Sequence, residues 1–448
     1  MNPLSLIVAA ALLVGLVYCV WRPQVALVAV VLQFPIEQLV QSYFTIALRY
    51  SWLVNAVVAG LVGIGLLSRI TQGKSLLAGF KNPVTVWVMV LFAQATVGLL
   101  WSPGHVNGAD MMIAGAPYLV LMMILAPMLV SEVEEYQALL VPFMITGSVV
   151  ALLIFVNPNM TFYAGRMTIE LAVIGKDDRG SPLALADAGG MLALVAVLYA
   201  APRRAPLLLA LRVASFLLGM RLAIVSGSRG QVIAAIACGL LFYPVARRIA
   251  NMKQFVGVTI GVAVLVLAFY VGFRLFVGYD NESRWGARDF ETSVEERSYR
   301  IKKLLTAYME SPGSWPFGLG TNALSAVVPG DNYVHNFFVE VLCEQGLVGV
   351  GVVGAILWTT FASGRRLWRM HPDDRAWRAT VAVLGAQSGF FLLLSMKQGT
   401  FISGGDTFMY WLFLGKIARS EQLRAAGEEF EHAELEEPEL HERALAAR

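Results

Sequence analysis

A succession of apolar runs, each of about 17–25 residues, constrains this chain more than any other feature of its sequence. A run of that length crosses the hydrocarbon core of a bilayer as one helix. The chain has 448 residues, of which 57% are hydrophobic and 15% are charged, whereas a soluble domain carries about 25% charged residues. A single soluble core cannot bury this much apolar surface. The sequence therefore predicts an all-α polytopic membrane protein.

We predict twelve or thirteen transmembrane helices. The second run is a poor span because Pro35 and Glu37 lie inside it, and the last run is short. The candidate runs are residues 4–20, 23–39, 52–69, 83–101, 111–130, 136–156, 183–201, 206–226, 229–245, 254–277, 334–361, 378–396 and 405–418. The first run lacks the basic segment and the cleavage site of a signal peptide, so we expect it to be a retained helix.

Lysine and arginine residues in the short loops predict the orientation. They occur in alternate loops, so all of these loops lie on one side of the membrane, and the positive-inside rule makes that side cytoplasmic. The residues are Lys74, Lys81, Arg203, Arg204, Arg247, Arg248, Lys253, Arg365, Arg366, Arg369, Arg375 and Arg378. The opposite loops, 102–110, 157–182, 226–230, 278–333 and 397–404, then face outward, which is the periplasm in a cell with two membranes. The formal net charge of +3 gives no reason to expect nucleic acid as a partner.

Two segments depart from the pattern of short loops. The outer segment 278–333 is too long for a connector, and it contains a helix-like charged portion near 290–310 followed by a turn rich in breakers. Residues 421–448 are rich in glutamate, and we expect a cytoplasmic tail that is either a solvated helix or disordered. We therefore divide the chain into a transmembrane domain, 1–420, which includes the long loop, and an acidic tail.

The three cysteines lie in apolar runs and form no CxxC pattern. They are Cys19, Cys238 and Cys343. We expect small buried hydrophobic residues here, with no disulfide and no zinc site.

Arg229 opens an outer helix after the turn Ser226-Gly-Ser228. A helix start presents unpaired backbone N–H groups and the positive end of the helix dipole, so an arginine there can complete an anion site. The alternative is that Arg229 reaches to the membrane interface only because its side chain is long and charged.

Arg297 and Arg300 are three positions apart in the long outer segment, so on a helix they share a face. Two guanidinium groups on one face suit the capture of phosphate oxygens. The residues alone favour the plainer interpretation, an amphipathic surface helix in which Glu295 and Glu296 offset the basic residues.

His335 and Asn336 lie where a polar segment, beginning at Asp331, becomes a long apolar helix. A histidine, with an ordinary pKa near about 6.5, can be neutral at pH 7 and accept a proton from a hydroxyl. Glu340 and Glu344 follow Asn336 at helical spacing on one face, and we expect them to pair with a neighbouring helix. We expect the next glycines, Gly346, Gly349, Gly351 and Gly354, to permit close helix packing.

Motifs for a metal or a nucleotide are missing from the outer loops. No Asp-x-Asp pair occurs there, and Asp177–Asp178 is a lone pair. There is no Walker loop, and Gly318-Leu-Gly320 reads as a turn because no strand precedes it. We therefore expect no metal and no cofactor, and chemistry outside the cytoplasm that uses a donor carried on a lipid.

The sequence resembles the O-antigen ligase/polymerase superfamily of bacterial membrane glycosyltransferases. Three features carry the resemblance: Ser228-Arg229-Gly230 at a helix start, Arg297 about fifteen residues before a proline and a Gly-x-Gly turn, and His335-Asn336 followed by Glu344–Gly349. They span roughly 225–360. The resemblance implies a glycosyltransferase of the C type that takes a glycan from undecaprenyl diphosphate on the periplasmic face of the inner membrane, without a metal.

The resemblance also implies roles for residues. Arg229 and Arg297 would hold the donor diphosphate, and His335 would help to activate the acceptor hydroxyl, with Asn336 as a further substrate-binding residue. Because the turn Ser311–Gly320 is longer than the usual spacing, Arg300 remains a rival to Arg297.

Three functions stay open at this point. A ligase moves a finished glycan onto an acceptor glycan or lipid A–core, and a polymerase joins repeat units for O-antigen, capsule or exopolysaccharide. We prefer the ligase because the matched motifs carry that name. A flippase is the alternative of another class, although transporters favour ionisable residues near the midplane of several helices in two repeated halves, a pattern we do not find.

Overall fold

The computed structural model describes residues 14–171, 179–200, 205–247, 251–276, 287–328, 334–398, 400–402 and 404–446. Asp177 and Asp178, Arg203 and Arg204, Arg248 and the segment 277–286 lie outside these ranges, as does the polar start at Asp331. The described residues form helices almost throughout, which confirms the predicted all-α membrane fold.

The elements follow one another in this order. They are η1 (Pro23–Val25), α2 (Ala26–Val31), α3 (Gln33–Tyr43), α4 (Thr45–Arg49), α5 (Trp52–Thr71), α6 (Pro83–Gly98), α7 (His105–Val120), η2 (Leu121–Leu125), α8 (Ala126–Met128), α9 (Val133–Phe155), β1 (Met160–Tyr163), β2 (Arg166–Ile169), α10 (Pro182–Leu198), α11 (Pro206–Val225), α12 (Arg229–Arg247), α13 (Met252–Phe276), α15 (Ala287–Met309), η4 (Pro312–Ser314), α16 (Leu324–Val327), α17 (Phe337–Met370), α18 (Arg375–Ser395) and α19 (Gly405–Ala446).

Seven of the described helices are long and apolar enough to span a membrane, or eight if the bent pair Pro23–Val31 and Gln33–Tyr43 counts as one span. The pair bends by 68°, in the run that contains Pro35 and Glu37. α6, α10 and the first part of α13 are apolar but shorter than a full span. Twelve of the thirteen predicted runs therefore coincide with a helix or a bent pair, and most of the remaining run, 4–20, lies outside the described residues. Length and composition of the described helices support fewer spans than the twelve or thirteen expected.

A small hairpin interrupts the helical pattern in the predicted outer loop 157–182. β1 and β2 pair antiparallel, with Met160 opposite Ile169 and Tyr163 opposite Arg166. Met167 and Ile169 are buried against α9, α10 and α11, so the hairpin covers one end of these helices.

Helix starts follow local chemistry. Pro83, Pro182 and Pro206 occupy first-turn positions, where a missing N–H costs nothing. Asn82 and Asp374 cap α6 and α18 by accepting hydrogen bonds from backbone N–H groups of the first turn. These signals fix where the apolar runs begin as helices.

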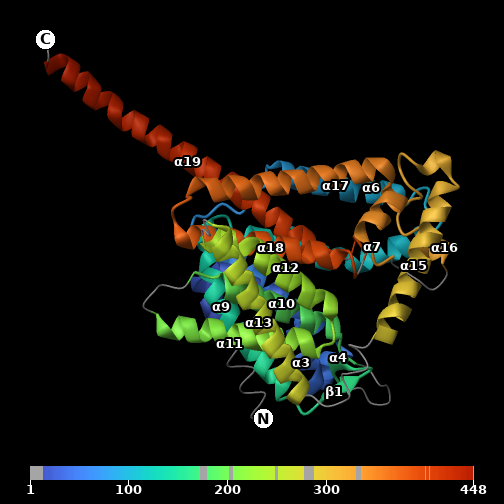
Figure 1. Cartoon of the computed structure of the whole chain (residues 1–448). Helices are drawn as coiled ribbons and strands as arrows, with labels where there is room; N and C mark the ends of the chain where they lie inside the picture. Colours follow the sequence, from blue (N-terminus) through green and yellow to red (C-terminus); the bar gives the residue numbers. More distant parts are fainter. Residues whose placement is uncertain are drawn as a thin grey trace.

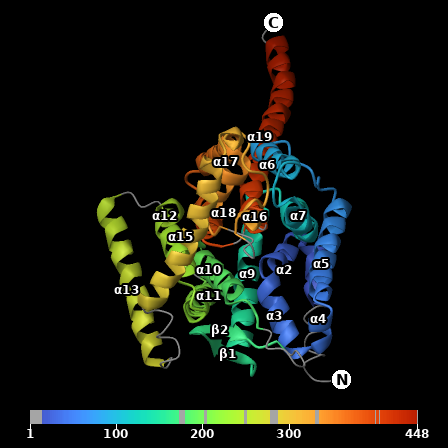
Figure 2. The same cartoon turned by 90° about the vertical axis from the view of Figure 1, so that its right-hand side faces the viewer.

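The described helices pack into a bundle whose two ends differ (Figure 1). α15, α16 and the start of α17 lie together at one end, and the last part of α19 projects from the other (Figure 1). α19 is continuous to Ala446, so the helical alternative for the acidic tail holds that far. α13 stands at the margin of the bundle, beside α12 and α15 (Figure 2).

Side chains tie the segments of the projecting end to one another. Lys74 pairs with Glu135 at 2.7 Å, Lys416 donates to Ser131 at 2.9 Å, and Arg366 donates to Gln422 at 3.0 Å. Two loops predicted to share the positive side thus contribute to this end. The three cysteines are buried and free, as predicted.

Candidate functional site

The polar segment before α17 places His335 and Asn336 at the helix start, as the sequence predicts. Asn336 is the N-cap residue, and its side chain accepts a hydrogen bond from the backbone N–H of Val339 at 3.2 Å. His335 has a φ of 61°, which is uncommon for a residue other than glycine. Residues held in such conformations cluster at functional sites.

His335 contacts the segment that follows α18. Its Nδ1 lies 2.9 Å from the backbone oxygen of Lys397. A carbonyl oxygen only accepts, so Nδ1 carries the proton and donates it to this bond. In the neutral ring Nε2 is then the basic nitrogen. The carbonyl of Lys397 therefore decides which nitrogen of His335 can take up a proton.

Lys397 also reaches the start of α12. Arg229 begins this helix, as predicted, and the turn before it is buried while Arg229 itself is half-buried. A Cβ on Gly230 would overlap the Lys397 side chain, so the two residues touch. The Nζ of Lys397 donates to Oε1 of Gln231. One lysine thus joins the helix start at Arg229 to His335, although the sequence analysis did not single it out.

Gln231 extends this network to α10. Its Nε2 lies 3.0 Å from Oδ1 of Asp187 and 2.8 Å from Oε1 of Gln398. The Nε2 of Gln398 donates to the other oxygen of Asp187 at 3.0 Å. Two amides from different elements therefore hold the carboxylate of Asp187.

A cavity of about 610 Å³ lies beside this network. Asp187 and Gln398 line it, as do Asp406 and Tyr118, whose hydroxyl donates to Oδ2 of Asp406 at 2.8 Å. Besides Tyr118, its aromatic lining residues are Phe34, Phe337, Phe391, Phe401 and Phe408. Carboxylates and amides bind hydroxyl groups, and aromatic rings cover apolar faces, so the cavity suits a hydroxyl-rich ligand such as a sugar.

Asp187 and Asp406 are functional candidates that the sequence analysis missed. Both lie inside predicted spans, 183–201 and 405–418. An ionisable residue in a membrane span indicates a functional site by default. Applied to every span, that rule selects both residues, but nothing in the sequence says that they share a cavity.

Glu340 supports the wall of the cavity. It is 3% exposed, and its Oε1 accepts the backbone N–H of Phe401 at 3.2 Å. The sequence predicts that Glu340 pairs with a neighbouring helix. Its partner in the structure is instead the backbone of the segment just before α19.

Glu344 and Gly346 belong to a break in α17, where Gly346 has a non-helical φ of 68°. The turn Trp315–Gly320 enters this break, and four backbone hydrogen bonds join the two segments: Leu319 to Cys343, Gly320 to Glu344, Leu347 to Trp315 and Val348 to Pro316. The Glu344 carboxylate accepts the backbone N–H of Asn322 at 2.7 Å. It also accepts the backbone N–H of Leu324, the first residue of α16, at 3.5 Å, so Glu344 binds the segment that leads from the turn into this neighbouring helix.

The prediction of close helix packing is wrong for Gly346, Gly351 and Gly354, and a Cβ on Gly349 would meet Gln345 and Val341 of α17 itself. Gly346 is needed because a Cβ there would overlap the backbone of Pro316, while nothing lies within 4 Å of a Cβ on Gly351 or Gly354. The Gly-x-Gly turn predicted at Gly318 is present. The backbone carbonyl of Gly318 accepts a hydrogen bond from the indole N–H of Trp101 at 3.2 Å.

Arg297 and Arg300 lie on α15, which the sequence predicts as a helix near 290–310, and both are half-buried. Ile301 and Leu304, one turn further on, pack with Val334 beside the start of α17. Arg297 and Arg300 lie on the same face of α15 as Ile301 and Leu304, at three- and four-residue spacing. Both arginines are therefore equally good candidates to bind the diphosphate.

A family model described as O-antigen ligase matches residues 214–354, from within α11 to the middle of α17. This match supports membership of the O-antigen ligase/polymerase superfamily. No curated protein matches the chain.

The O-antigen ligase match includes Arg229, Arg297, Arg300, His335 and Asn336. Asp187, Lys397, Gln398 and Asp406 lie outside it. The structure thus adds to the family region a second set of polar residues from α10, from the segment between α18 and α19, and from the start of α19. In the part of the chain that the structure describes, no group of three or more His, Cys, Asp or Glu side chains could hold a metal ion.

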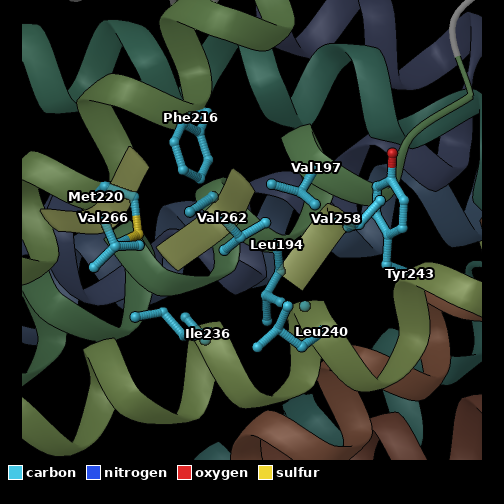
Figure 3. A pocket seen from close by; sticks show the side chains of 13 residues that line it. Leu194, Val197, Phe216, Met220, Ile236, Leu240, Tyr243, Val258, Val262 and Val266 are labelled. Carbon is cyan, nitrogen blue, oxygen red and sulfur yellow. The ribbon is translucent and has the colours of Figure 1, made fainter. Parts of the chain in front are cut away.

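A different pocket, of about 140 Å³, lies among α10, α11, α12 and α13 (Figure 3). Its lining is apolar except for Tyr243, and Val258, Val262 and Val266 supply the α13 side. It offers no group for the glycosyl transfer expected of an O-antigen ligase. We therefore place the candidate site at the cavity beside His335.

Proposed function

We propose that this chain transfers a glycan from undecaprenyl diphosphate to a sugar hydroxyl on the periplasmic face of the inner membrane. The family supports an O-antigen ligase or polymerase type of function in polysaccharide biosynthesis. We prefer the ligase function, in which the acceptor is a glycan or lipid A–core. The protein is surrounded by membrane lipid.

One observation carries the proposal: Lys397 joins the start of α12, with Arg229, to His335. The departing diphosphate gains negative charge in the transition state, and cations fixed in place stabilise that charge. Arg229, with Arg297 or Arg300 from α15, holds the diphosphate in this proposal. No metal is needed when guanidinium groups take this part.

His335 acts as the general base. Its Nδ1–H is engaged by Lys397, so Nε2 takes the proton from the acceptor hydroxyl as the hydroxyl oxygen attacks the anomeric carbon of the donor. The bond from that carbon to the diphosphate oxygen breaks, and undecaprenyl diphosphate leaves. The cavity with Asp187 and Asp406 binds the sugars that flank the new bond.

The decisive measurement is turnover of the purified protein on an undecaprenyl-diphosphate glycan. We expect His335→Ala and Arg229→Ala each to lower the rate by about 100-fold or more, because each removes a group that acts in the transition state. His371→Ala, at the other end of α17, is the matched control and should transfer normally. Near-normal turnover of His335→Ala would contradict the mechanism.

Two further experiments test the finer parts. A single cysteine at position 335 should react with a reagent confined to the periplasm, and labelling from the cytoplasm alone would overturn the orientation. In a deletion strain, full-length chains left on the carrier lipid identify a ligase, and single repeat units identify a polymerase. Carrier-bound glycans that accumulate on the cytoplasmic leaflet identify a flippase.

A further inference from the structure

The end of α17 far from His335 carries an exposed set of aromatic and basic side chains. Trp358, Phe361 and Trp368 are 69%, 63% and 42% exposed. Arg365 and Arg369 are also exposed, and they follow Phe361 at four-residue spacing, so all three share one face of the helix.

A cavity of about 390 Å³ lies against this face. Arg365, Arg366 and Arg369 line it together with Trp358 and Phe361, and none of the described residues that line it carries a carboxylate. Among the described residues, none of these three arginines forms an ion pair. The cavity therefore has a net positive lining that no described residue balances through an ion pair.

A second cavity, of about 410 Å³, shares Phe361 and Arg365 with the first. Its other lining residues are mainly apolar and come from α12, α17, α18 and α19, with small residues at Gly364, Gly385 and Gly389. An apolar cavity thus meets a basic cavity at Arg365.

We infer that the two cavities together bind one anionic phospholipid. Its phosphate lies against Arg365 and Arg369, which offer charge-assisted hydrogen bonds, and an acyl chain fills the apolar cavity. Trp358 and Trp368 cover the boundary between headgroup and chain, the position that tryptophan favours in membranes. This site is separate from the glycan site, and it does not depend on the proposed glycosyl transfer.

Binding is measured on the full chain in a zwitterionic detergent, by native mass spectrometry and by the shift of the unfolding temperature on adding dipalmitoyl phosphatidylglycerol. We expect the double variant Arg365→Ala/Arg369→Ala to bind about thirtyfold more weakly, because each arginine near an anionic lipid contributes about 1 kcal/mol. Arg419→Ala, an exposed arginine on α19 that lines neither cavity, is the matched control and should bind like the wild type.

Other probes separate the sources of the phosphate. Dipalmitoyl phosphatidylcholine and soluble glycerol phosphate should both bind far more weakly than phosphatidylglycerol. Equal binding of phosphatidylcholine, full competition by glycerol phosphate, or unchanged binding by the double variant would each overturn the inference. Loss of binding in the double variant, with an unfolding temperature in lipid-free detergent that matches the wild type, would support it.

Discussion

At the end of the bundle from which α19 projects, buried cations are closed off by protein groups, whereas at the end that holds His335 half-buried carboxylates line a cavity. Arg69 is 1% exposed and pairs with Glu135 at 2.8 Å, and Lys416 is fully buried against the carbonyls of Pro127 and Val130. At the other end, Asp187 is held by amides and Asp406 by a tyrosine hydroxyl.

The difference separates charges that hold the fold from charges that meet a ligand. An ion pair buried at the closed end leaves no room for another molecule, and removal of one partner exposes the full cost of burying the other. At the cavity, neutral amide and hydroxyl donors orient carboxylates that line an open space. We therefore expect mutations at the closed end to affect stability, and mutations of the cavity carboxylates to affect transfer.

The largest effect on stability is expected at the closed end. Glu135→Gln removes the partner of Arg69, which stays buried, so the free energy of unfolding should fall by about 3–5 kcal/mol. Lys74→Gln removes the exposed partner of the same carboxylate, 42% exposed, and should cost less than about 1 kcal/mol. Unfolding in detergent, followed by tryptophan fluorescence, measures both. Equal losses would show that Arg69 and Glu135 are not the structural pair.

The second-largest effect on stability is expected at the break in α17. This break lies at the cavity end, so that end also contains contacts that stabilise the fold. Gly318→Ala puts a Cβ onto the backbone of Glu344 at a φ of 79°, so the turn must leave the break. We expect a loss of about 3 kcal/mol in the free energy of unfolding. Gly351→Ala, in the same helix with nothing within 4 Å, should change it by about 1 kcal/mol or less.

An unchanged unfolding curve for Gly318→Ala would contradict the interlock of the turn with α17. If Gly351→Ala lowered the free energy of unfolding as much as Gly318→Ala does, the loss could not be assigned to the contact between the turn and α17.

These contrasts also mark what the sequence could predict. The helix starts at Arg229 and Phe337 were predictable because capping and turn residues act on the adjacent backbone. The sequence predicts only a packing residue at Gly346, because it carries no sign that the turn at Gly318 will pair with it. That pairing is made by backbone groups, which every residue possesses.

The cavity was predictable only in part. His335 and Arg229 lie at helix starts, which the adjacent sequence predicts. Lys397 binds His335 through its backbone carbonyl and contacts Gly230 with its side chain, and neither contact has a sequence signature. Asp187 and Asp406 are single polar residues in apolar runs, and only tertiary packing brings their helices together.

The cavity carboxylates give the third test. Asp406→Asn keeps the shape of the side chain and removes its charge, so we expect transfer to fall about tenfold through the loss of a charge-assisted hydrogen bond to substrate. The free energy of unfolding should change by less than about 1 kcal/mol. Asp110→Asn, an exposed residue on α7 that does not line the cavity, is the control.

Normal transfer by Asp406→Asn would mean that the glycan does not use this cavity. If Asp406→Asn lowered the free energy of unfolding strongly but left the transfer rate per folded molecule unchanged, Asp406 would be a structural residue, like Arg69 and Glu135.

The smallest effects compare two helix caps. Asn336 caps α17 beside His335, and Asp374 caps α18, the helix that follows the far end of α17. Alanine at either position should cost about 1 kcal/mol in the free energy of unfolding. Only Asn336→Ala should also slow transfer, because the cap positions the turn that carries His335. Asn336→Ser restores a cap but lacks the amide, so it separates the two roles of Asn336. Recovered transfer would assign Asn336 to positioning alone, and slow transfer with recovered stability would support the predicted contact with substrate.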